Sequence, residues 1–446
     1  MDSDPPKPKH DHEALIFPEG FLWGAATSAF QVEGGNIHSD WWEWEQTVQP
    51  SEKRSGQAAN QYELYEQDFH LAKSLGHNSH RLSIEWSRIE PEEGRFDQIE
   101  IDHYVKVLKK LKELNFTVML TLHHFTNPAW FAKKGGWENF NAPNYFERYV
   151  KKIIPEISEY VDFWITINEP GVLIWGGYLA AKWPPQKKSK WKALKAYWNL
   201  SQAHKKAYKT IHKITPKTRV GIANNLSSFD TFHHHSIREG IAEWFLDVTN
   251  NHFFYKLTGI NTHDFLGVNY YFNNYISFNG ETRFPSLVDV STTKKDVSDL
   301  GWEIYPEGIF DIIMDLSDYH LPIYITENGL ASTNDDRRVR FLLNYLKEIY
   351  HAIQTGADVR GYFHWSLVDN LELADGFTPR FGLVEIDYES LRASSASQNK
   401  TQSRKPRPSS YVYKEIIKHN GIPHDLLKLL GHGIKVEDVL KEDIEE

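Results

Sequence analysis

The sequence of 446 residues contains no cysteine. A chain without thiols forms no disulfide bond, offers no thiolate nucleophile and cannot build a Cys-ligated zinc or iron–sulfur site. Such a chain is compatible with a reducing compartment. The triplet His233-His234-His235 could bind a metal, but no carboxylate stands beside it at ligand spacing. We therefore predict an exposed loop at the triplet, and neither a metal nor a cofactor for the protein.

Long apolar segments are also missing. No stretch reaches the roughly 18 apolar residues that a membrane-spanning helix requires. Residues 1–13 are charged and proline-rich, and they lack the apolar run of a secretory signal. We therefore expect a cytoplasmic protein.

Positive charge is scarcer than negative charge. Lys and Arg total 50 against 60 for Asp and Glu, so the formal net charge is −10. This balance argues against a general nucleic-acid binder, whose affinity comes from clustered cations that displace phosphate counterions. It also disfavours binding to an anionic membrane surface. We expect neither nucleic acid nor a membrane as a partner, and a monomer or a small homo-oligomer.

Aromatic residues are abundant, at 14% of the chain. Carbohydrate-binding clefts use many flat rings, but a large aromatic core would give the same composition. The hydrophobic fraction of 40% with 25% charged residues is ordinary for a folded protein, which excludes extensive disorder. Composition alone thus leaves the role of the rings open.

Short β-rich runs alternate with longer helical patterns along most of the chain. The clearest helix covers residues 101–114, where apolar residues recur at steps of three and four, and Asp97 precedes it as a candidate N-cap. Several of the strands are almost continuously apolar, as expected when both faces are covered. Eight strands alternating with helices predict an α/β fold, a single (β/α)8 barrel with long βα loops. The expected strands span residues 21–27, 80–84, 117–123, 163–168, 219–224, 265–270, 323–326 and 361–366.

The barrel is expected to occupy residues 17–420. Residues 1–16 would form an N-terminal extension, and residues 421–446 a charged, helix-prone C-terminal extension. Residues 393–409 are rich in Ser, Lys, Arg, Gln and Pro and predict an exposed mobile loop. An open doubly wound sheet remains an alternative, although it usually has fewer strands and no glycine-rich phosphate loop follows the first strand.

Two glutamates follow apolar strands at the expected mouth of the barrel, where (β/α)8 enzymes carry their chemistry. Glu169 ends the fourth strand beside Asn168, and Glu327 ends the seventh strand beside Asn328. Strands four and seven should face each other across the ring. The two carboxyls could therefore flank one glycosidic bond, one of them protonated and the other ionised. Structural salt bridges are the alternative interpretation.

Motifs along the chain resemble family 1 of the glycoside hydrolases, the β-glucosidase and β-galactosidase family. They run in family order over roughly residues 17–417, and a full set in order is far more specific than any one of them. The matching stretches are FPEGFLWGAATSAFQVEG (17–34), HRLSIEWSRIEP (80–91), TLHHFTNPAWF (121–131), WITINEP (164–170), FLGVNYY (265–271), GWEIYPEG (301–308), YITENG (324–329), GYFHWSLVDNLE (361–372) and GFTPRFGL (376–383).

The resemblance implies a retaining β-glycosidase that releases terminal non-reducing β-D-glucosyl residues, with some tolerance for galactose or fucose, from small β-glycosides or oligosaccharides. It implies Glu169 as the acid/base and Glu327 as the nucleophile, with carboxyls about 5–5.5 Å apart. Arg81 and Tyr271 should contact Glu327, and Arg81 would keep it ionised through a charge-assisted hydrogen bond. The residues implied to hold the sugar are Gln31, His124, Asn168, Asn269, Glu372 and Trp365, the last as a platform beneath the ring.

Departures from the family pattern bear on the substrate. Leu373 stands where the family usually has Trp, so an indole N–H donor to the sugar is missing. Glu372 argues against the phospho-sugar subgroup, and Glu169 argues against thioglucosidases, which lack the acid. Two alternatives stay open: a transglycosidase, in which loop hydration selects the acceptor, and a carbohydrate-binding pseudoenzyme on the same scaffold.

Overall fold

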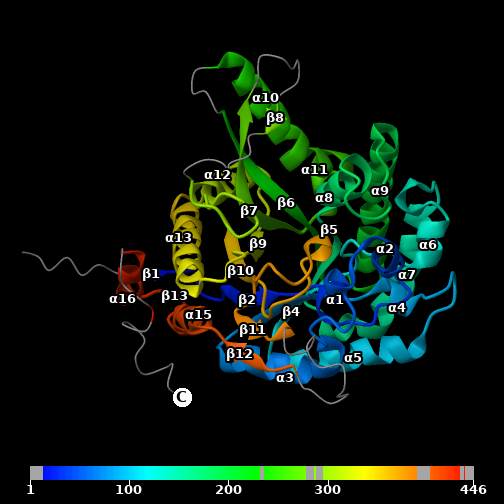
Figure 1. The fold of residues 1–446 in the computed structure, drawn as a ribbon, viewed down its shortest axis with the longest axis horizontal. Helices are drawn as coiled ribbons and strands as arrows, with labels where there is room; N and C mark the ends of the chain where they lie inside the picture. Colours follow the sequence, from blue (N-terminus) through cyan, green and yellow to red (C-terminus); the bar gives the residue numbers. More distant parts are fainter. Residues whose placement is uncertain are drawn as a thin grey trace, which may run out of the picture.

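The computed structural model describes residues 14–231, 236–277, 286–287, 295–388, 402–431 and 436. Its centre is a closed ring of eight parallel strands in which the last strand, β10, pairs with the first, β2 (Figure 1). All eight expected strands are present, so the predicted (β/α)8 barrel is confirmed. In ring order the strands are β2 (Leu22–Ala26), β3 (Ser79–Ser83), β4 (Thr117–Thr121), β5 (Phe163–Asn168), β6 (Arg219–Thr231), β7 (Phe265–Ser277), β9 (Ile323–Asn328) and β10 (Val359–Trp365).

Helices surround the ring, and the longer ones bury apolar residues against the strands or neighbouring helices (Figure 1). The predicted helix at 101–114 is α5, and the carboxylate of Asp97 accepts the N–H groups of Ile99 and Glu100, which confirms the N-cap. The longer helices are α3 (Gln61–Ser74), α5 (Gln98–Glu113), α7 (Ala142–Ile157), α9 (Lys190–Ile214), α10 (Ile237–Asp247), α12 (Glu307–Ser317), α13 (Asp335–Gln354) and α15 (Pro408–Lys418). The shorter ones are α1 (Ala29–Val32), α2 (Asp40–Val48), α4 (Trp86–Ile89), α6 (Ala129–Lys133), α8 (Pro170–Ile174), α11 (Phe253–Thr258) and α16 (His424–Leu427).

The inside of the ring is packed with side chains. Met119, Phe163, Phe265, Tyr324 and Phe363 are all buried there and belong to one apolar cluster. Because this packing plugs the barrel, a substrate can enter only at an end, where the loops begin.

Two strands run further than the sequence predicts. β6 and β7 continue past residues 224 and 270 and stay paired as far as Thr231 and Ile276. The added residues are more polar than the apolar runs inside the ring. A prediction based on runs of apolar residues therefore ends these strands too early. The pairing carries Asn225 and Tyr271 to the rim of the barrel as parts of strands.

The ends of the described chain belong to the barrel unit. β1 (Leu15–Ile16) pairs antiparallel with β13 (Gly421–Ile422), although the predicted boundaries place both strands in extensions. The expectation of an exposed loop does not hold for residues 402–409, because β12 (Arg404–Pro406) pairs with β11 (Val384–Ile386) and α15 begins at Pro408. Residues 393–401 and the histidine triplet lie outside the described residues. Within the described part, no helix is both long and apolar enough to cross a membrane.

Arg404 provides a test of this last segment. Its side chain is 1% exposed and lies 2.7 Å from the fully buried carboxylate of Asp68. Arg404→Ala would leave that carboxylate buried without its cation, so we expect a loss of about 3–5 kcal/mol in the free energy of unfolding. Arg95→Ala, which breaks an exposed pair with Glu92, should cost less than about 1 kcal/mol. Denaturant titration measures both variants, and equal losses would contradict a structural role for Arg404.

Candidate active site

Glu327 lies at the carboxyl end of β9, and donors bind both of its oxygens. Arg81 on β3 donates from Nη1 to Oε1 at 2.5 Å and also to the carbonyl of Thr326 at 2.9 Å. The hydroxyl of Tyr271 on β7 donates to Oε2 at 2.7 Å. One donor is a buried guanidinium, so a positive charge lies directly beside this carboxylate.

Glu169 lies at the end of β5 in an uncommon backbone conformation. Its φ is 45°, in the left-handed region that non-glycine residues rarely adopt. Its N–H donates to the carbonyl of Ala223 on β6 at 2.7 Å, and α8 begins with the next residue, Pro170. The strand and the helix therefore hold the strained residue in place, a pattern that is frequent at functional sites.

Among the described residues, no cation donates to the carboxyl of Glu169 as Arg81 does to that of Glu327. Its Oε1 accepts hydrogen bonds from Asn269 at 2.8 Å and Asn225 at 3.2 Å, both neutral amides. Burial, and then the negative charge of Glu327, raises the pKa of Glu169 to about 8. Glu169 is therefore protonated at neutral pH, while its neighbour has a guanidinium to balance a charge.

Shared amides connect the two carboxyls. Asn168 Oδ1 accepts from Arg81 Nη2 at 2.6 Å and from Asn269 Nδ2 at 3.2 Å, so one oxygen joins the partners of both glutamates. Asn269 also stands opposite Glu327 in the β7–β9 register. Two strands separate β5 from β9 on one side of the ring and four on the other. The two glutamates therefore face each other across the mouth, as we expect from the sequence. Their strands are not diametrically opposed.

His124 and Trp365 form one wall of the site. Their rings are nearly parallel, at 15°, with centroids 6.1 Å apart. His124 Nε2 accepts from Asn168 Nδ2 at 3.2 Å, which places the proton on Nδ1. Burial, with the charge of Arg81, holds the pKa of His124 well below its ordinary value, so the ring stays neutral. Among the described residues Nδ1 has no partner, which makes it a donor for a bound hydroxyl group.

Gln31 binds the protein more fully than the family resemblance implies. Its Nε2 donates to the carbonyl of Leu371 at 2.6 Å and to Asn370 Oδ1 at 3.2 Å, while its Oε1 accepts from Ser28 at 2.7 Å. Both amide hydrogens are thus used within the protein. The side chain anchors the loop that leads into Glu372.

Glu372 is a third buried carboxyl close to the pair. Burial raises the pKa of Glu372 to about 8, and the negative charges of Asp375, Glu327 and Glu169 add to this effect. Its Oε2 has no hydrogen-bond partner among the described residues. A protonated carboxyl can donate one hydrogen bond and accept others, which suits recognition of neighbouring sugar hydroxyls.

The structure thus brings the predicted site residues to one end of the barrel and adds two that sequence reasoning misses. Asn225, which contacts Glu169, follows an apolar run just as Asn168 does, so the same signal could have identified it. Thr326 donates its hydroxyl to Asn269 Oδ1 at 2.6 Å and so orients that amide toward Glu169. Nothing in the sequence marks Thr326. Its other contact is the backbone carbonyl that accepts from Arg81, and any residue type could supply that carbonyl.

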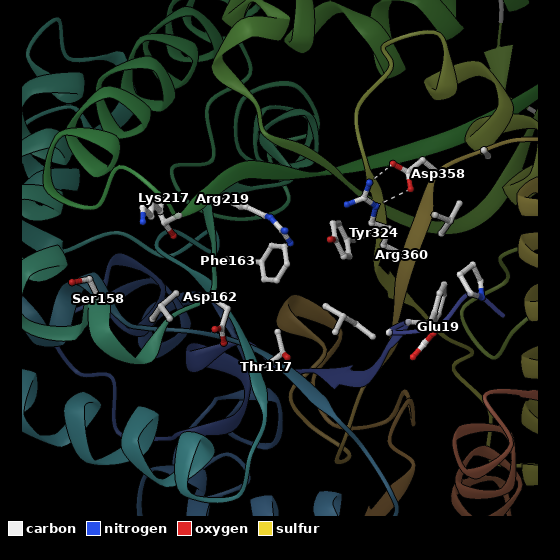
Figure 2. A pocket seen from close by; sticks show the side chains of 18 residues that line it. Glu19, Thr117, Ser158, Asp162, Phe163, Lys217, Arg219, Tyr324, Asp358 and Arg360 are labelled. Carbon is white, nitrogen blue, oxygen red and sulfur yellow. Dashed lines mark hydrogen bonds and ion pairs between the residues drawn. The ribbon is translucent and has the colours of Figure 1, made fainter.

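A concavity opens at the opposite end of the barrel, away from the two glutamates (Figure 2). It has a volume of about 870 Å³, and aromatic and cationic side chains such as Phe163, Tyr324 and Arg219 line it. Its carboxylates, those of Glu19, Asp162 and Asp358, are not buried. This end of the barrel therefore lacks the buried, electrostatically coupled acids that the strand carboxyl ends provide.

The fold and the site together define a class. A (β/α)8 barrel whose mouth holds one protonated carboxyl beside one charge-balanced carboxylate is the arrangement of a glycoside-cleaving enzyme.

Comparisons with known proteins agree with this class. The pattern of Glycosyl hydrolase family 1 matches residues 13–259 and 254–422. A β-galactosidase of Pyrococcus woesei is 32% identical over 94% of this chain and 100% of its own length. β-Glucosidase A of Acetivibrio thermocellus is 32% identical over 91% of this chain and 99% of its own. The solved β-glycosidase of Pyrococcus horikoshii superposes with a TM-score of 0.85 at 38% identity, covering 94% of this chain and 99% of that one.

The chain therefore belongs to glycosyl hydrolase family 1, whose members are retaining β-glucosidases and β-galactosidases. The resemblance read from the motifs is confirmed.

The raised pKa of Glu372 predicts how stability changes with pH. The folded state keeps this proton up to pH about 8, whereas the unfolded state releases it near the ordinary value of 4.5. Below pH 4.5 the carboxyl is protonated in both states, so it does not reduce the free energy of unfolding. As the pH rises toward 8 only the unfolded state releases the proton, so the free energy of unfolding falls. Glu372→Gln stays neutral, so we expect it to gain on the order of a few kcal/mol over the unchanged protein at pH 8. Urea titrations across this range measure the difference, and parallel curves would refute it.

Proposed function

We propose that this chain hydrolyses terminal β-D-glucosides, with Glu327 as nucleophile and Glu169 as acid and base. The observation that carries the proposal is the contrast between the two carboxyls. Glu327 has a cation and a phenol as donors, whereas Glu169 has only neutral amides and a pKa raised to about 8. A retaining mechanism needs these two states at once.

In the first step, an oxygen of Glu327 attacks the anomeric carbon while the bond to the leaving oxygen breaks. Glu169 gives its proton to that oxygen, so the aglycone leaves as a neutral alcohol. The product of the step is a glycosyl ester of Glu327. Arg81 stays beside Glu327 in the ester. Its positive charge is therefore in place when the second step turns Glu327 back into a carboxylate.

In the second step, Glu169 acts as a base. Its proton left with the aglycone, and the charge of Glu327 is now held in the ester, so the like-charge repulsion that raised its pKa is gone. The carboxylate of Glu169 removes a proton from water, and the water oxygen attacks the anomeric carbon from the face that the aglycone vacated. The bond to Glu327 breaks, and the sugar leaves with its original configuration.

Sugar recognition would fall to Gln31, His124, Trp365, Glu372, Asn168 and Asn269. The indole face of Trp365 suits the C–H face of a pyranose, and the neutral imidazole and buried carboxyl suit hydroxyl groups. Glu372 also offers no positive charge that could bind the phosphate of a phosphorylated sugar.

Other sequence predictions remain predictions. These are the 5–5.5 Å separation of the two carboxyls, the cytoplasmic location, the lack of a metal or cofactor, and the monomeric or small oligomeric state.

Replacing the nucleophile tests the proposal directly. Glu327→Gln keeps the shape of the side chain but cannot form the glycosyl ester, so we expect turnover to fall by about 10⁴-fold or more. Glu63→Gln, on an exposed face of α3, is the matched control and should keep full activity. The assay compares aryl β-glucoside, β-galactoside, β-fucoside and 6-phospho-β-glucoside side by side, with the glucoside expected to react fastest. Near-normal activity of Glu327→Gln would remove it from the role.

The acid is tested by a pH profile. Since Glu169 must be protonated for the first step, kcat/KM should decline as pH rises through about 8. Glu169→Gln should lose this alkaline limb, and its deglycosylation should slow by roughly 10²–10⁴-fold, the usual contribution of a general acid or base. Added azide, which needs no base, should restore turnover and yield a β-glycosyl azide. An unchanged alkaline limb in the variant would assign the titration to another group.

A further inference from the structure

The charge of this protein is very unevenly distributed. Residues 170–229 contain no Asp or Glu, yet they include eleven lysines and one arginine. This cationic segment belongs to a chain whose formal net charge is −10. The net value describes the average of the molecule and hides one strongly basic region, which covers α8, α9 and β6 as far as Phe229. The expectation that the protein has no membrane partner rests on the net value and therefore does not apply to this region.

The exposed side of α9 is apolar as well as basic. Trp191, Leu194 and Trp198 recur at steps of three and four and are 83%, 56% and 53% exposed. Ala193 and Ala196, on the other side of the helix, are buried against the barrel. The outward face thus presents two indole rings and a leucine where a polar surface is expected.

A π-helical turn, Trp175–Leu179, extends this face. Trp175 is 49% exposed and Leu179 is 41% exposed. Two backbone hydrogen bonds fasten the segment before α9 to the turn: Lys187 N–H donates to the Gly177 carbonyl at 2.8 Å, and Ser189 N–H to the Tyr178 carbonyl at 2.9 Å. We call the combined surface the basic aromatic face. It comprises Trp175, Leu179, Trp191, Leu194, Trp198, Lys182, Lys187, Lys188, Lys190, Lys192 and Lys195.

The cations of the basic aromatic face are mostly unpaired. Lys192 lies 3.3 Å from Glu138, and the ammonium of Lys182 lies 4.9 Å from the centre of the Trp175 ring. For the other four lysines, no carboxylate of the described residues lies within 4.0 Å. Their charge is therefore available to an external anion.

We propose that the basic aromatic face binds an anionic lipid surface. Indole rings favour the boundary between headgroups and acyl chains, and lysines beside them are attracted to anionic headgroups. A helix lying in the membrane plane needs this combination of an apolar side and a cationic rim. The proposal does not depend on the catalytic assignment.

Two other occupants fit the face less well. A second copy paired symmetrically would set the lysines of one face against those of the other, which is electrostatically unfavourable. Nucleic-acid surfaces rely heavily on arginine, whose planar group binds phosphates and bases in bidentate fashion. Residues 170–218 contain lysine and no arginine.

Vesicle flotation tests the proposal with the full-length protein. We expect binding to phosphatidylcholine vesicles that contain phosphatidylglycerol, no binding to phosphatidylcholine alone, and release as added salt screens the charges. Lys187→Gln with Lys188→Gln should lower the partition coefficient about 20- to 30-fold, since each lysine near an anionic surface contributes about fivefold. Trp191→Ala with Trp198→Ala should lower it at least about tenfold, because the apolar contact is lost.

A helix on another side of the barrel provides the matched control. On α5, Ile99 is 77% exposed and Lys106 and Lys109 are also exposed. The triple variant Ile99→Ala, Lys106→Gln, Lys109→Gln should bind vesicles like the unchanged protein. All variants should hydrolyse a soluble aryl glucoside at the same rate, which shows that they are folded.

Several results would overturn the proposal. Failure of the unchanged protein to float with anionic vesicles is one, and an equal loss in the α5 variant is another. A dimer that Trp191→Ala with Trp198→Ala dissociates, without any vesicle binding, would show a contact between copies. Salt-sensitive binding to a DNA duplex in place of vesicles would assign the face to nucleic acid.

Discussion

The buried contact between Arg81 and Glu327 is the interaction on which the rest of the site depends. A guanidinium and a carboxylate inside a barrel are costly to bury separately, and each compensates the other only while their geometry is kept. Arg81 meets this condition because its Nη2 also binds Asn168 on β5 and its Nη1 also binds the carbonyl of Thr326 on β9. One side chain from β3 thus connects three strands and fixes where the negative charge of the site lies.

The properties of the other acid follow from that placement. Glu169 shares the low-dielectric pocket with Glu327 but lacks a comparable cation, so burial and like charge both favour its protonated form. Glu372 is subject to the same two influences and has a similarly raised pKa. Chemically identical side chains therefore acquire different tasks from their surroundings alone. The left-handed backbone of Glu169 also costs free energy. Its hydrogen bond to β6 and the start of α8 at the next residue hold it in that conformation.

The basic aromatic face shows the same dependence on position. A net charge of −10 describes the whole chain, but partners meet local surfaces. The lysines and indoles of α9 act together only because the opposite side of the helix is buried against the barrel. The segment begins directly after Glu169, so a membrane contact there would be made close to the mouth of the barrel.

The sequence by itself determined the eight strands and the helix α5 with its cap at Asp97, and it placed two glutamates at strand ends, because apolar periodicity and strand-end polarity are local signals. It did not determine the length of β6 or the anchoring role of Gln31, which arise from strand pairing and hydrogen bonds with distant segments. Only the tertiary structure shows what raises the pKa of Glu169 and which indoles meet solvent. Both depend on charges and burial created by residues distant in the sequence, which no local pattern encodes.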